Sequence, residues 1–281
     1  MKKDLVLVVG ASGTVGSELV KLIGQKGFRV RATTSKVVKS GQSDLFQINL
    51  ATGEGVKAAF EGVDRAFLLS PPGYADQYAT LSPLVQEAKR KGLKKVVLMT
   101  AMGADAVETS PFRRVELELE KSGISYNIIR PNWFLQNFNT FWIQGIREQG
   151  KILVPGGSAK VSFIDARDIA AVAAELLTND KHSNKAFDLT GSESVDHATV
   201  AQALAKATGK PIQYQDISPE TFRQALLSAG LPADYVSFLL MIFGFLREGY
   251  SARKTDHVKQ ITGKDPINLN QYAADFKQAW L

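Results

Sequence analysis

The stretch that decides the fold lies near the amino terminus and reads Leu5-Val6-Leu7-Val8-Val9-Gly10-Ala11-Ser12-Gly13-Thr14-Val15-Gly16. An apolar run that leads into a glycine turn predicts a parallel strand buried on both faces, followed at once by a helix. Gly10 would permit the tight turn, Gly13 would let the backbone approach a pyrophosphate, and Gly16 would let the helix pack closely. Free amides at the start of the helix would face the phosphates. A turn that merely needs glycine is the alternative, but strand, turn, helix and second strand in this order favour dinucleotide binding.

The second strand, expected over residues 28–33, favours NADP(H) over NAD(H). NAD-specific folds usually end this strand with an acidic residue that binds the ribose hydroxyls. Here the strand ends without one, in Val30-Arg31-Ala32-Thr33-Thr34-Ser35-Lys36. Arg31 and Lys36 could neutralise a 2′-phosphate, and Thr33 or Ser35 could donate hydrogen bonds to it. Two exposed basic residues without a ligand are the alternative.

Strands and helices alternate over the first half of the chain. Apolar runs predict further strands at residues 45–50, 65–69, 96–99 and 124–130. Helices are expected between them at residues 56–60, 74–91 and 110–123, the last capped by Ser110 and followed by Pro111 in its first turn. This alternation predicts an α/β fold, a Rossmann doubly wound parallel sheet.

Beyond Pro131 the pattern loosens. It predicts a helix at residues 136–149, short strands at 151–154, 161–164 and 186–189, a helix that Asp168 caps and that ends near Thr178, and apolar helices at 218–229 and 233–248. We expect a dinucleotide-binding domain over residues 1–150, with 160–190 returning to the sheet region. Residues 191–281 would form a smaller, mostly helical substrate lobe or lid at the carboxyl ends of the strands.

Further motifs resemble the atypical short-chain dehydrogenase/reductases, and among them the NmrA-like branch. They are Phe67-Leu68-Leu69-Ser70-Pro71-Pro72, Val96-Val97-Leu98-Met99-Thr100, Glu116 with Ser122-Gly123-Ile124-Ser125-Tyr126 and Arg130-Pro131-Asn132-Trp133-Phe134, and Val161-Ser162-Phe163-Ile164-Asp165-Ala166-Arg167-Asp168-Ile169-Ala170. The branch includes NADP-sensing regulators and enzymes similar to the bacterial NAD(P)H:quinone oxidoreductase and triphenylmethane dye reductase. The resemblance covers nearly the whole chain and is specific for fold and cofactor rather than for substrate.

The resemblance implies more of the cofactor site. Besides the glycine turn, the residues expected to contact the dinucleotide are Leu69, Ser70, Pro71, Pro72, Thr100, Ala101, Pro131, Asn132, Trp133 and Phe134. Thr100 and Trp133 are the candidates beside the nicotinamide. Prolines and aromatic rings at strand ends would give a rigid, dry wall against which a flat ring can stack. For Trp133 and Phe134, ordinary core packing is the alternative.

The Tyr and Lys, four residues apart, that classical members of the superfamily use as acid and base are missing from their usual helix. The one literal match, Tyr250 with Lys254, lies near the carboxyl terminus, and we interpret it as coincidence. The helix after the fifth strand instead carries a packing stripe of Phe112, Val115 and Leu119 and an exposed pair of Arg114 and Glu118. Many relatives carry Lys or His where Phe112 aligns.

Two functions fit this loss. The first is an NADPH-dependent oxidoreductase that transfers hydride by positioning to a quinone or similar conjugated aromatic acceptor, which needs little help from an acid. The second is a non-catalytic NADP(H)-binding redox sensor of the NmrA type. Candidate substrate contacts are Tyr74, Met102, Phe112, Trp133, Tyr235, Phe238 and Met241; the apolar helices from Phe222 to Phe245 could instead bind a partner.

Composition excludes other chemistry. With no cysteine, disulfides and thiol nucleophiles are ruled out, and the scattered net charge of +6 favours small anions only mildly. His182, His197 and His257 lie far apart among polar residues, so we expect surface positions and no metal site. The apolar stretch 238–246 is too short to span a bilayer. We expect a cytoplasmic protein, able to form a homodimer, that binds neither membrane nor nucleic acid directly.

Overall fold

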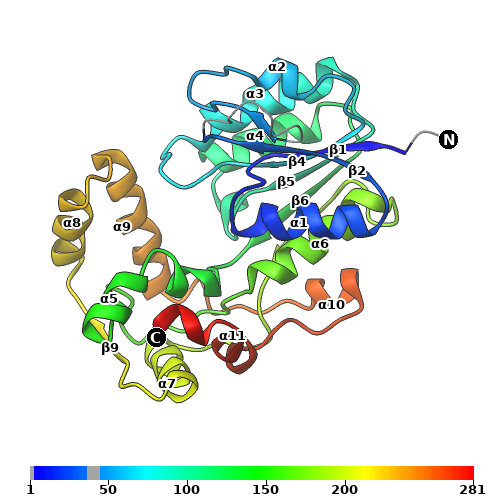
Figure 1. The fold of residues 1–281 in the computed structure, drawn as a ribbon. Helices are drawn as coiled ribbons and strands as arrows, with labels where there is room; N and C mark the ends of the chain where they lie inside the picture. Colours follow the sequence, from blue (N-terminus) through cyan, green and yellow to red (C-terminus); the bar gives the residue numbers. More distant parts are fainter. Residues whose placement is uncertain (1–2, 37–44) are drawn as a thin grey trace. The chain divides into compact units, whose positions relative to one another are not determined.

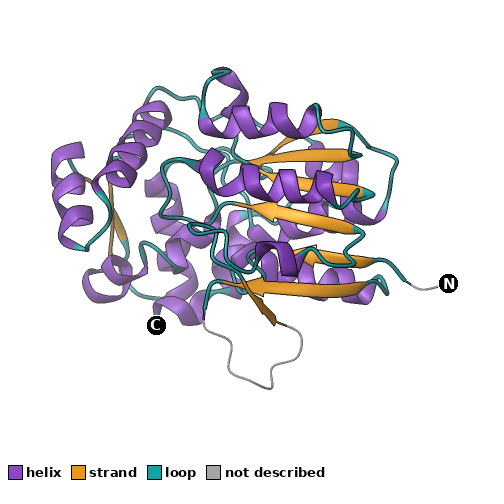
Figure 2. Cartoon of the chain, turned by 90° about the horizontal axis from the view of Figure 1, so that it is seen from above, coloured by secondary structure: helices purple, strands orange, loops and turns teal. Residues whose placement is uncertain are grey.

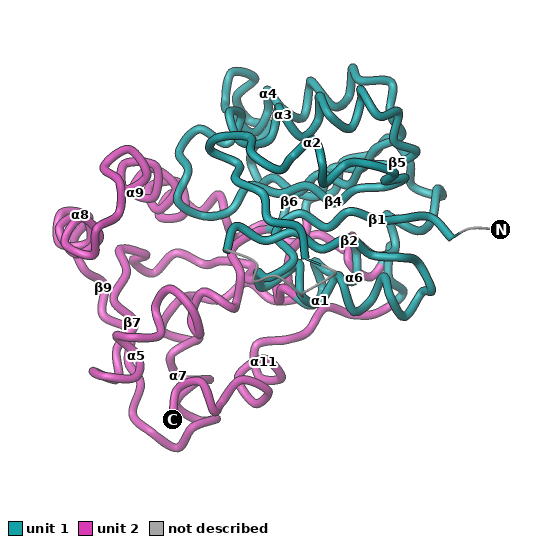
Figure 3. The backbone as a smooth tube through the Cα atoms, turned by 45° about the horizontal axis from the view of Figure 1, so that its top comes forward, with its two compact units in different colours: residues 1–131, 167–188, 260–263 teal, residues 132–166, 189–259, 264–281 magenta. Residues whose placement is uncertain are grey.

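The computed structural model describes residues 3–36 and 45–281, which divide into two compact units. Unit 1 comprises residues 1–131, 167–188 and 260–263, and unit 2 comprises residues 132–166, 189–259 and 264–281 (Figure 3). These limits differ from the expected ones. Residues 132–150 belong to unit 2 rather than to the dinucleotide-binding domain, and only 167–188 of the returning stretch lies in unit 1.

The described part of unit 1 is built on a seven-stranded sheet in the order β3-β2-β1-β4-β5-β6-β8. Strands are drawn as orange arrows in Figure 2, with helices packed on the sheet. The strands are β1 (Leu5–Val8), β2 (Arg29–Thr34), β3 (Leu45–Gln47), β4 (Arg65–Leu69), β5 (Lys95–Met99), β6 (Tyr126–Pro131) and β8 (Lys185–Leu189). Neighbours from β3 to β6 pair in parallel; Val8, for example, lies opposite Ala32 of β2 and Phe67 of β4. The predicted doubly wound fold is therefore confirmed.

Helices cover both faces of this sheet. They are α1 (Thr14–Gln25), α2 (Val56–Ala59), α3 (Gln77–Arg90), α4 (Pro111–Glu120) and α6 (Ala166–Thr178), with a short 3-10 turn, η1 (Ala104–Ala106). The helices α2, α3 and α4 lie on one face, and α1 and α6 on the other (Figure 1). Leu5, Leu7 and Val9 join the core under the first group, so the alternation of a strand turns Val6 and Val8 toward the second. All five side chains are buried, which is why this strand reads as an unbroken apolar run.

Two helix starts in unit 1 test the predicted caps. Ser110 caps α4 as expected, because its hydroxyl accepts a hydrogen bond from the Arg113 amide at 3.3 Å. The other cap prediction is wrong: α6 begins at Ala166, so Asp168 lies within its first turn rather than at its cap. An acidic side chain there is still favourable beside the positive end of the helix dipole.

Unit 2 is mostly helical. Its described elements are η2 (Leu135–Asn139), α5 (Ile143–Gln149), β7 (Lys151–Val154), α7 (His197–Thr208), β9 (Gln213–Asp216), α8 (Pro219–Ser228), α9 (Ala233–Arg247), α11 (Leu269–Asp275) and η3 (Lys277–Trp280). The helix α10 (His257–Thr262) begins in unit 2 and ends in unit 1. The two strands pair in parallel, and Phe138, Leu204, Tyr272 and Trp280 lie in a second core.

Two predictions for unit 2 are wrong. The expected helix at 136–149 is interrupted at Thr140, where the backbone leaves the helical region, so that η2 and α5 are separate. The expected strand at 161–164 is reduced to isolated bridges, because Val161 pairs with Val195 while Ile164 pairs with Phe134. Among residues 3–36 and 45–281, no helix combines the length and apolar character needed to cross a membrane.

Candidate cofactor site

The turn between β1 and α1 is shaped by its glycines. Gly10 has a φ of +70°, which side chains disfavour, and a Cβ there would approach Leu69 to 3.0 Å. A Cβ on Gly16 would lie only 2.2 Å from the carbonyl oxygen of Gly10. The amide of Gly13 donates to that same oxygen at 2.9 Å and closes the turn. The backbone itself therefore requires glycine at positions 10 and 16.

The start of α1 offers donors to a ligand. The amides of Ser12, Thr14, Val15 and Gly16 donate to no other described residue, and the first turn carries no acidic side chain. Ser12, Gly13 and Thr14 are also exposed. Unpaired amides at the positive end of a helix dipole, next to a glycine surface, are what a diphosphate binds. The residues present therefore fit the diphosphate of a dinucleotide.

The turn lies where doubly wound sheets bind ligands. The chain builds from β1 to β2 and β3 in one direction and then from β4 to β6 in the other, so the strand order reverses between β1 and β4. The carboxyl ends of the parallel strands meet at this edge of unit 1. They bring Thr34, Ser70, Thr100 and Pro131 to the same side as Gly10.

Two of the residues predicted to bind a 2′-phosphate are engaged elsewhere within unit 1. Thr33 is fully buried beneath the turn: its hydroxyl donates to the Val8 carbonyl at 3.3 Å and accepts from the Gly10 amide at 3.3 Å. The guanidinium of Arg31 donates to the carbonyl oxygens of Ala59 and Glu61 and lies over the ring of Phe46, 4.5 Å from its centroid. Both side chains therefore have structural partners.

The end of β2 gathers a different group around Thr34, which is itself buried. Ser35 and Lys36 are exposed, as a phosphate site requires. The hydroxyls of Ser12 and Thr34 lie 3.3 Å apart, and the Lys36 amide donates to Thr34 at 3.1 Å. Thr34 was missed from the sequence, although strand alternation places it on the face opposite Thr33.

The ends of β4 and β5 are less open. Ser70 is half-buried and accepts a hydrogen bond from Thr80 at 2.9 Å, with Pro71 half-buried and Pro72 exposed beyond it. Thr100 is buried, and its hydroxyl donates to Glu116 at 2.7 Å. Its proton is therefore committed to a carboxylate, which argues against Thr100 as a proton donor. Ala101 and Met102 are half-buried.

The side chains of α4 match the predicted packing stripe but not the predicted ion pair. Phe112 packs against the core of unit 1 together with the buried Val115 and Leu119, as expected. The predicted pair of Arg114 and Glu118 is not formed: Arg114 lies 3.9 Å from the ring centroid of Tyr78, and Glu118 accepts from Gln86 at 3.2 Å.

Most of the remaining cofactor and substrate candidates lie in unit 2. Asn132 is buried and donates to Ser162 at 2.7 Å, and the ring of Trp133 lies 4.8 Å from that of Phe243. Phe134 is half-buried. The rings of Tyr235 and Phe238 stack at 6.0 Å on α9, where Met241 is half exposed. Of the other candidates, Tyr74 is half-buried in unit 1.

A buried histidine in unit 2 corrects another prediction. His197, expected on the surface, has no exposed area, and its ring stacks on Tyr214 with centroids 5.3 Å apart. Neither ring nitrogen has a hydrogen-bond partner within the described part of the chain. Burial lowers the pKa of His197 to about 4, against the opposing effect of Asp196 and Asp216. The helical spacing of residues 197, 200, 201 and 204 could have revealed this buried face.

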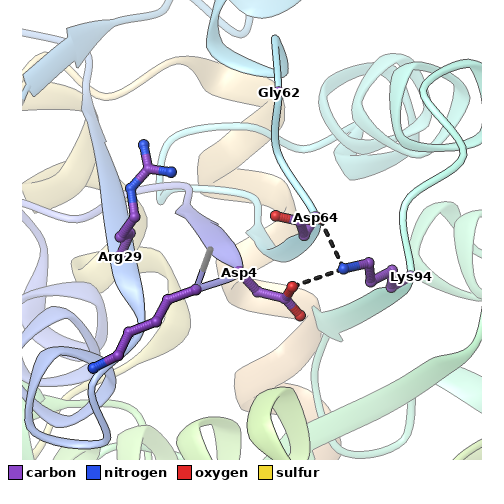
Figure 4. A pocket seen from close by; sticks show the side chains of 6 residues that line it. Asp4, Arg29, Gly62, Asp64 and Lys94 are labelled. Carbon is purple, nitrogen blue, oxygen red and sulfur yellow. Dashed lines mark hydrogen bonds and ion pairs between the residues drawn. The ribbon is translucent and has the colours of Figure 1, made fainter. Parts of the chain in front are cut away.

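A depression of about 220 Å³ lies at the opposite edge of the sheet, near the amino ends of the strands (Figure 4). Its charged walls are largely paired: Lys94 binds Asp4 at 2.7 Å and Asp64 at 3.0 Å. Hydrogen bonds from Lys94 and Arg65 hold the pKa of the Asp4 carboxyl below its ordinary value. We interpret this cluster as a structural ion-pair network, distant from the glycine turn in the sheet.

Strand order, glycine turn and free amides together define a Rossmann-type α/β protein. The chain belongs to the NmrA-like family, whose sequence profile matches residues 2–272. An NAD(P)H azoreductase of Xenophilus azovorans is 32% identical over 280 residues, which cover 96% of each chain.

Solved structures share the fold. The NADPH-dependent quinone oxidoreductase of Escherichia coli, complexed with NADPH, superimposes with a TM-score of 0.81 at 21% identity and covers 96% of this chain and 99% of its own. The triphenylmethane reductase of Citrobacter, complexed with NADP(H), superimposes with a TM-score of 0.80 at 22% identity. The match covers 98% of this chain and 99% of the reductase. NmrA, a negative transcriptional regulator complexed with NADP, superimposes with a TM-score of 0.75 at 17% identity. The match covers 99% of this chain and 96% of NmrA. At these identities the likeness shows the fold alone.

Proposed function

We propose that this protein is an NADPH-dependent oxidoreductase that transfers hydride to a quinone or a similar conjugated aromatic acceptor. The observation that carries the proposal is the glycine turn, whose unpaired amides lie beside the hydroxyls of Ser12 and Thr34. A bound nicotinamide dinucleotide would supply the hydride. The azoreductase relative adds azo compounds to the acceptors that deserve testing.

The residues at the end of β2 would select the phosphorylated cofactor. Ser35 and Lys36 are exposed, and residues 29–36 contain no carboxylate that would repel a 2′-phosphate. Lys36 would provide charge, while Ser12, Thr34 and Ser35 would provide hydroxyl donors. Thr33 and Arg31 would contribute only by fixing the turn and the strand.

Catalysis would rest on positioning rather than on an acid. Electron-poor acceptors take hydride without a protonated side chain, provided that the reacting atoms are held about 3–3.5 Å apart. Ser70, Pro71, Pro72 and Ala101 would line the nicotinamide half of the cofactor. Unit 2 carries aromatic side chains in Trp133, Tyr235 and Phe238, and an adaptable one in Met241, of the kind that bind flat molecules.

The test is NADPH oxidation at 340 nm with a panel of quinones, triphenylmethane dyes and azo dyes. We expect acceptor-dependent turnover that is faster with NADPH than with NADH. Lys36→Ala should remove that preference, whereas Lys26→Ala, which changes a basic residue at the far end of α1, should leave it intact. Equal turnover with both cofactors in the unmodified protein would contradict the NADPH assignment.

A redox sensor is the second candidate function. What supports it is the sequence of α4, because residues 111–120 include neither Tyr nor Lys and Arg113 there binds Glu116 and Glu120. A sensor would bind NADP tightly in calorimetry and show no turnover above background with any acceptor of the panel. Turnover with a single acceptor would exclude a purely sensory role.

A further inference from the structure

One buried carboxylate connects the ends of two strands in unit 1. Glu116 lies on α4 with no exposed area. Within the described residues, one of its oxygens accepts hydrogen bonds from Thr100 at 2.7 Å and from Arg130 at 2.9 Å, and the other from Arg130 at 2.7 Å and from Arg113 at 3.0 Å. Thr100 follows β5 directly and Arg130 lies at the end of β6, so one side chain holds both strand ends.

The same region is held by further bonds. The Thr100 amide donates to the Ile129 carbonyl and the Met102 amide to the Pro131 carbonyl, both at 3.0 Å, so the chains stay paired beyond the end of β5. Arg130 also donates to Asp105 of η1 at 2.5 Å. The segment from Thr100 to Met102 is therefore fixed by its backbone against β6 and by one hydroxyl against Glu116.

The position of this network suggests a role beyond stability. The neighbouring buried residues of α4, Val115 and Leu119, are apolar, and an apolar side chain at position 116 would continue their face. A buried ion pair often stabilises a fold no better than well-packed apolar residues, while it fixes geometry through directed bonds. Here the fixed geometry is at the strand ends beside the switch point of the sheet.

We propose that Glu116 is a positioning residue for the nicotinamide half of a bound dinucleotide. The inference rests on the proposed function. A dinucleotide whose diphosphate lies at the start of α1 extends across the switch point, toward the ends of β4, β5 and β6. Glu116 has no exposed area, so it acts through its bonds to the Thr100 hydroxyl and to the Arg130 guanidinium. These bonds fix the start of the segment from Thr100 to Met102 against the end of β6.

The test compares two ligands in matched variants. Thr100→Val removes the hydroxyl at nearly constant shape, Thr100→Ser restores it, and Glu116→Gln removes the charge. Glu120→Gln is the control, because it removes the charge of the other carboxylate bound to Arg113, one turn beyond Glu116, and within the described chain Glu120 bonds neither Thr100 nor Arg130. Affinities for NADPH and for 2′,5′-ADP, which lacks the nicotinamide half, are measured by calorimetry. Turnover is measured with NADPH and with NADPH deuterated at the transferred position.

We expect Thr100→Val and Glu116→Gln to lower the affinity for NADPH about tenfold. Their affinity for 2′,5′-ADP should stay within about twofold of that of the unmodified protein. Turnover should fall by up to about 100-fold, the size expected when reacting atoms are misplaced by an ångström, and the isotope effect should rise. Thr100→Ser should recover most of the affinity and turnover that Thr100→Val loses, and Glu120→Gln should behave like the unmodified protein.

Variants that only lower the melting temperature, or weaken both ligands equally, would overturn the positioning role and leave the proposed function intact. If the unmodified protein binds 2′,5′-ADP and NADPH equally well, the nicotinamide half is not held, which also overturns it. If that protein binds neither ligand, the proposed function fails and the positioning role falls with it. Should Glu116→Gln not fold, the Thr100 pair decides the question.

Discussion

Replacing His197 by leucine should remove part of the acid sensitivity of this fold. His197 is buried among the rings of Phe138, Phe163, Trp142 and Tyr214, and burial lowers its pKa from 6.5 to about 4. The folded chain therefore resists protonation at this ring. The unfolded chain, in which the ring is solvated, accepts a proton near pH 6.5.

The sign and size of the effect follow from linkage. Because the unfolded state binds the additional proton first, the free energy of unfolding falls as the pH drops below about 6.5 and levels off below about 4. The slope between these limits approaches 1.4 kcal/mol per pH unit, and the total loss is about 3 kcal/mol. Above pH 7 the ring is neutral in both states and contributes no pH dependence.

The assay is urea unfolding at a series of pH values from 4 to 8, followed by tryptophan fluorescence. Trp133, Trp142 and Trp280 are the tryptophans of the chain and all lie in unit 2 with His197, so the signal reports on the relevant unit. The free energy of unfolding of the unmodified protein minus that of His197→Leu should fall by about 3 kcal/mol from pH 7 to pH 4. Leucine is apolar and close in volume, so the core should tolerate it.

His182→Gln is the matched control. Burial also lowers the pKa of His182, together with Lys181 and Lys185, but its ring is only half-buried and belongs to unit 1. The variant His182→Gln should leave the unfolding curve reported by the unit 2 tryptophans nearly unchanged. If unmodified protein and His197→Leu lose stability in parallel between pH 6.5 and 4, the ring is protonated in the folded state and the argument from burial is refuted.

Three further predictions test unit 1. Lys36→Ala should weaken NADPH binding about tenfold more than NADH binding in calorimetry, and the difference should be smaller at high salt. Arg31→Ala should instead lower the melting temperature, because the Arg31 guanidinium donates to two backbone carbonyls. A selective loss of NADPH binding in Arg31→Ala would contradict this structural role. Gly16→Ala should prevent folding or abolish cofactor binding, because the new Cβ would lie 2.2 Å from the Gly10 carbonyl oxygen. In the same helix, the Cβ of Gly24→Ala would have no neighbouring atom within 4 Å, so this variant should raise the free energy of unfolding by about 0.5–1 kcal/mol. Lys95→Met should raise it by about 1 kcal/mol in urea unfolding, since burial lowers the pKa of this lysine and penalises its charge more than the Ser183 hydroxyl at 2.7 Å and the exposed Asp180 carboxylate at 3.9 Å stabilise it. Marked destabilisation would show that the charge is needed.

Local patterns were sufficient for the architecture. The apolar run from Leu5 to Val9, the glycines at positions 10 and 16, and the Ser110 cap each act on neighbouring residues, so their consequences can be derived without knowing the rest of the fold. Alternation of strands and helices then allows few arrangements, and the one predicted is the one found.

The details of the site depended on partners distant in the chain. Arg31 was assigned to a phosphate because its carbonyl acceptors lie 28 and 30 residues away, and Arg114 was paired with Glu118 because Tyr78 could not be foreseen beside it. His197 appeared polar from its neighbours in sequence, yet rings from four other segments bury it. Periodicity reports which face of an element is apolar. Which side chain meets which polar group across elements is decided only when the chain packs, because those contacts carry no local signal.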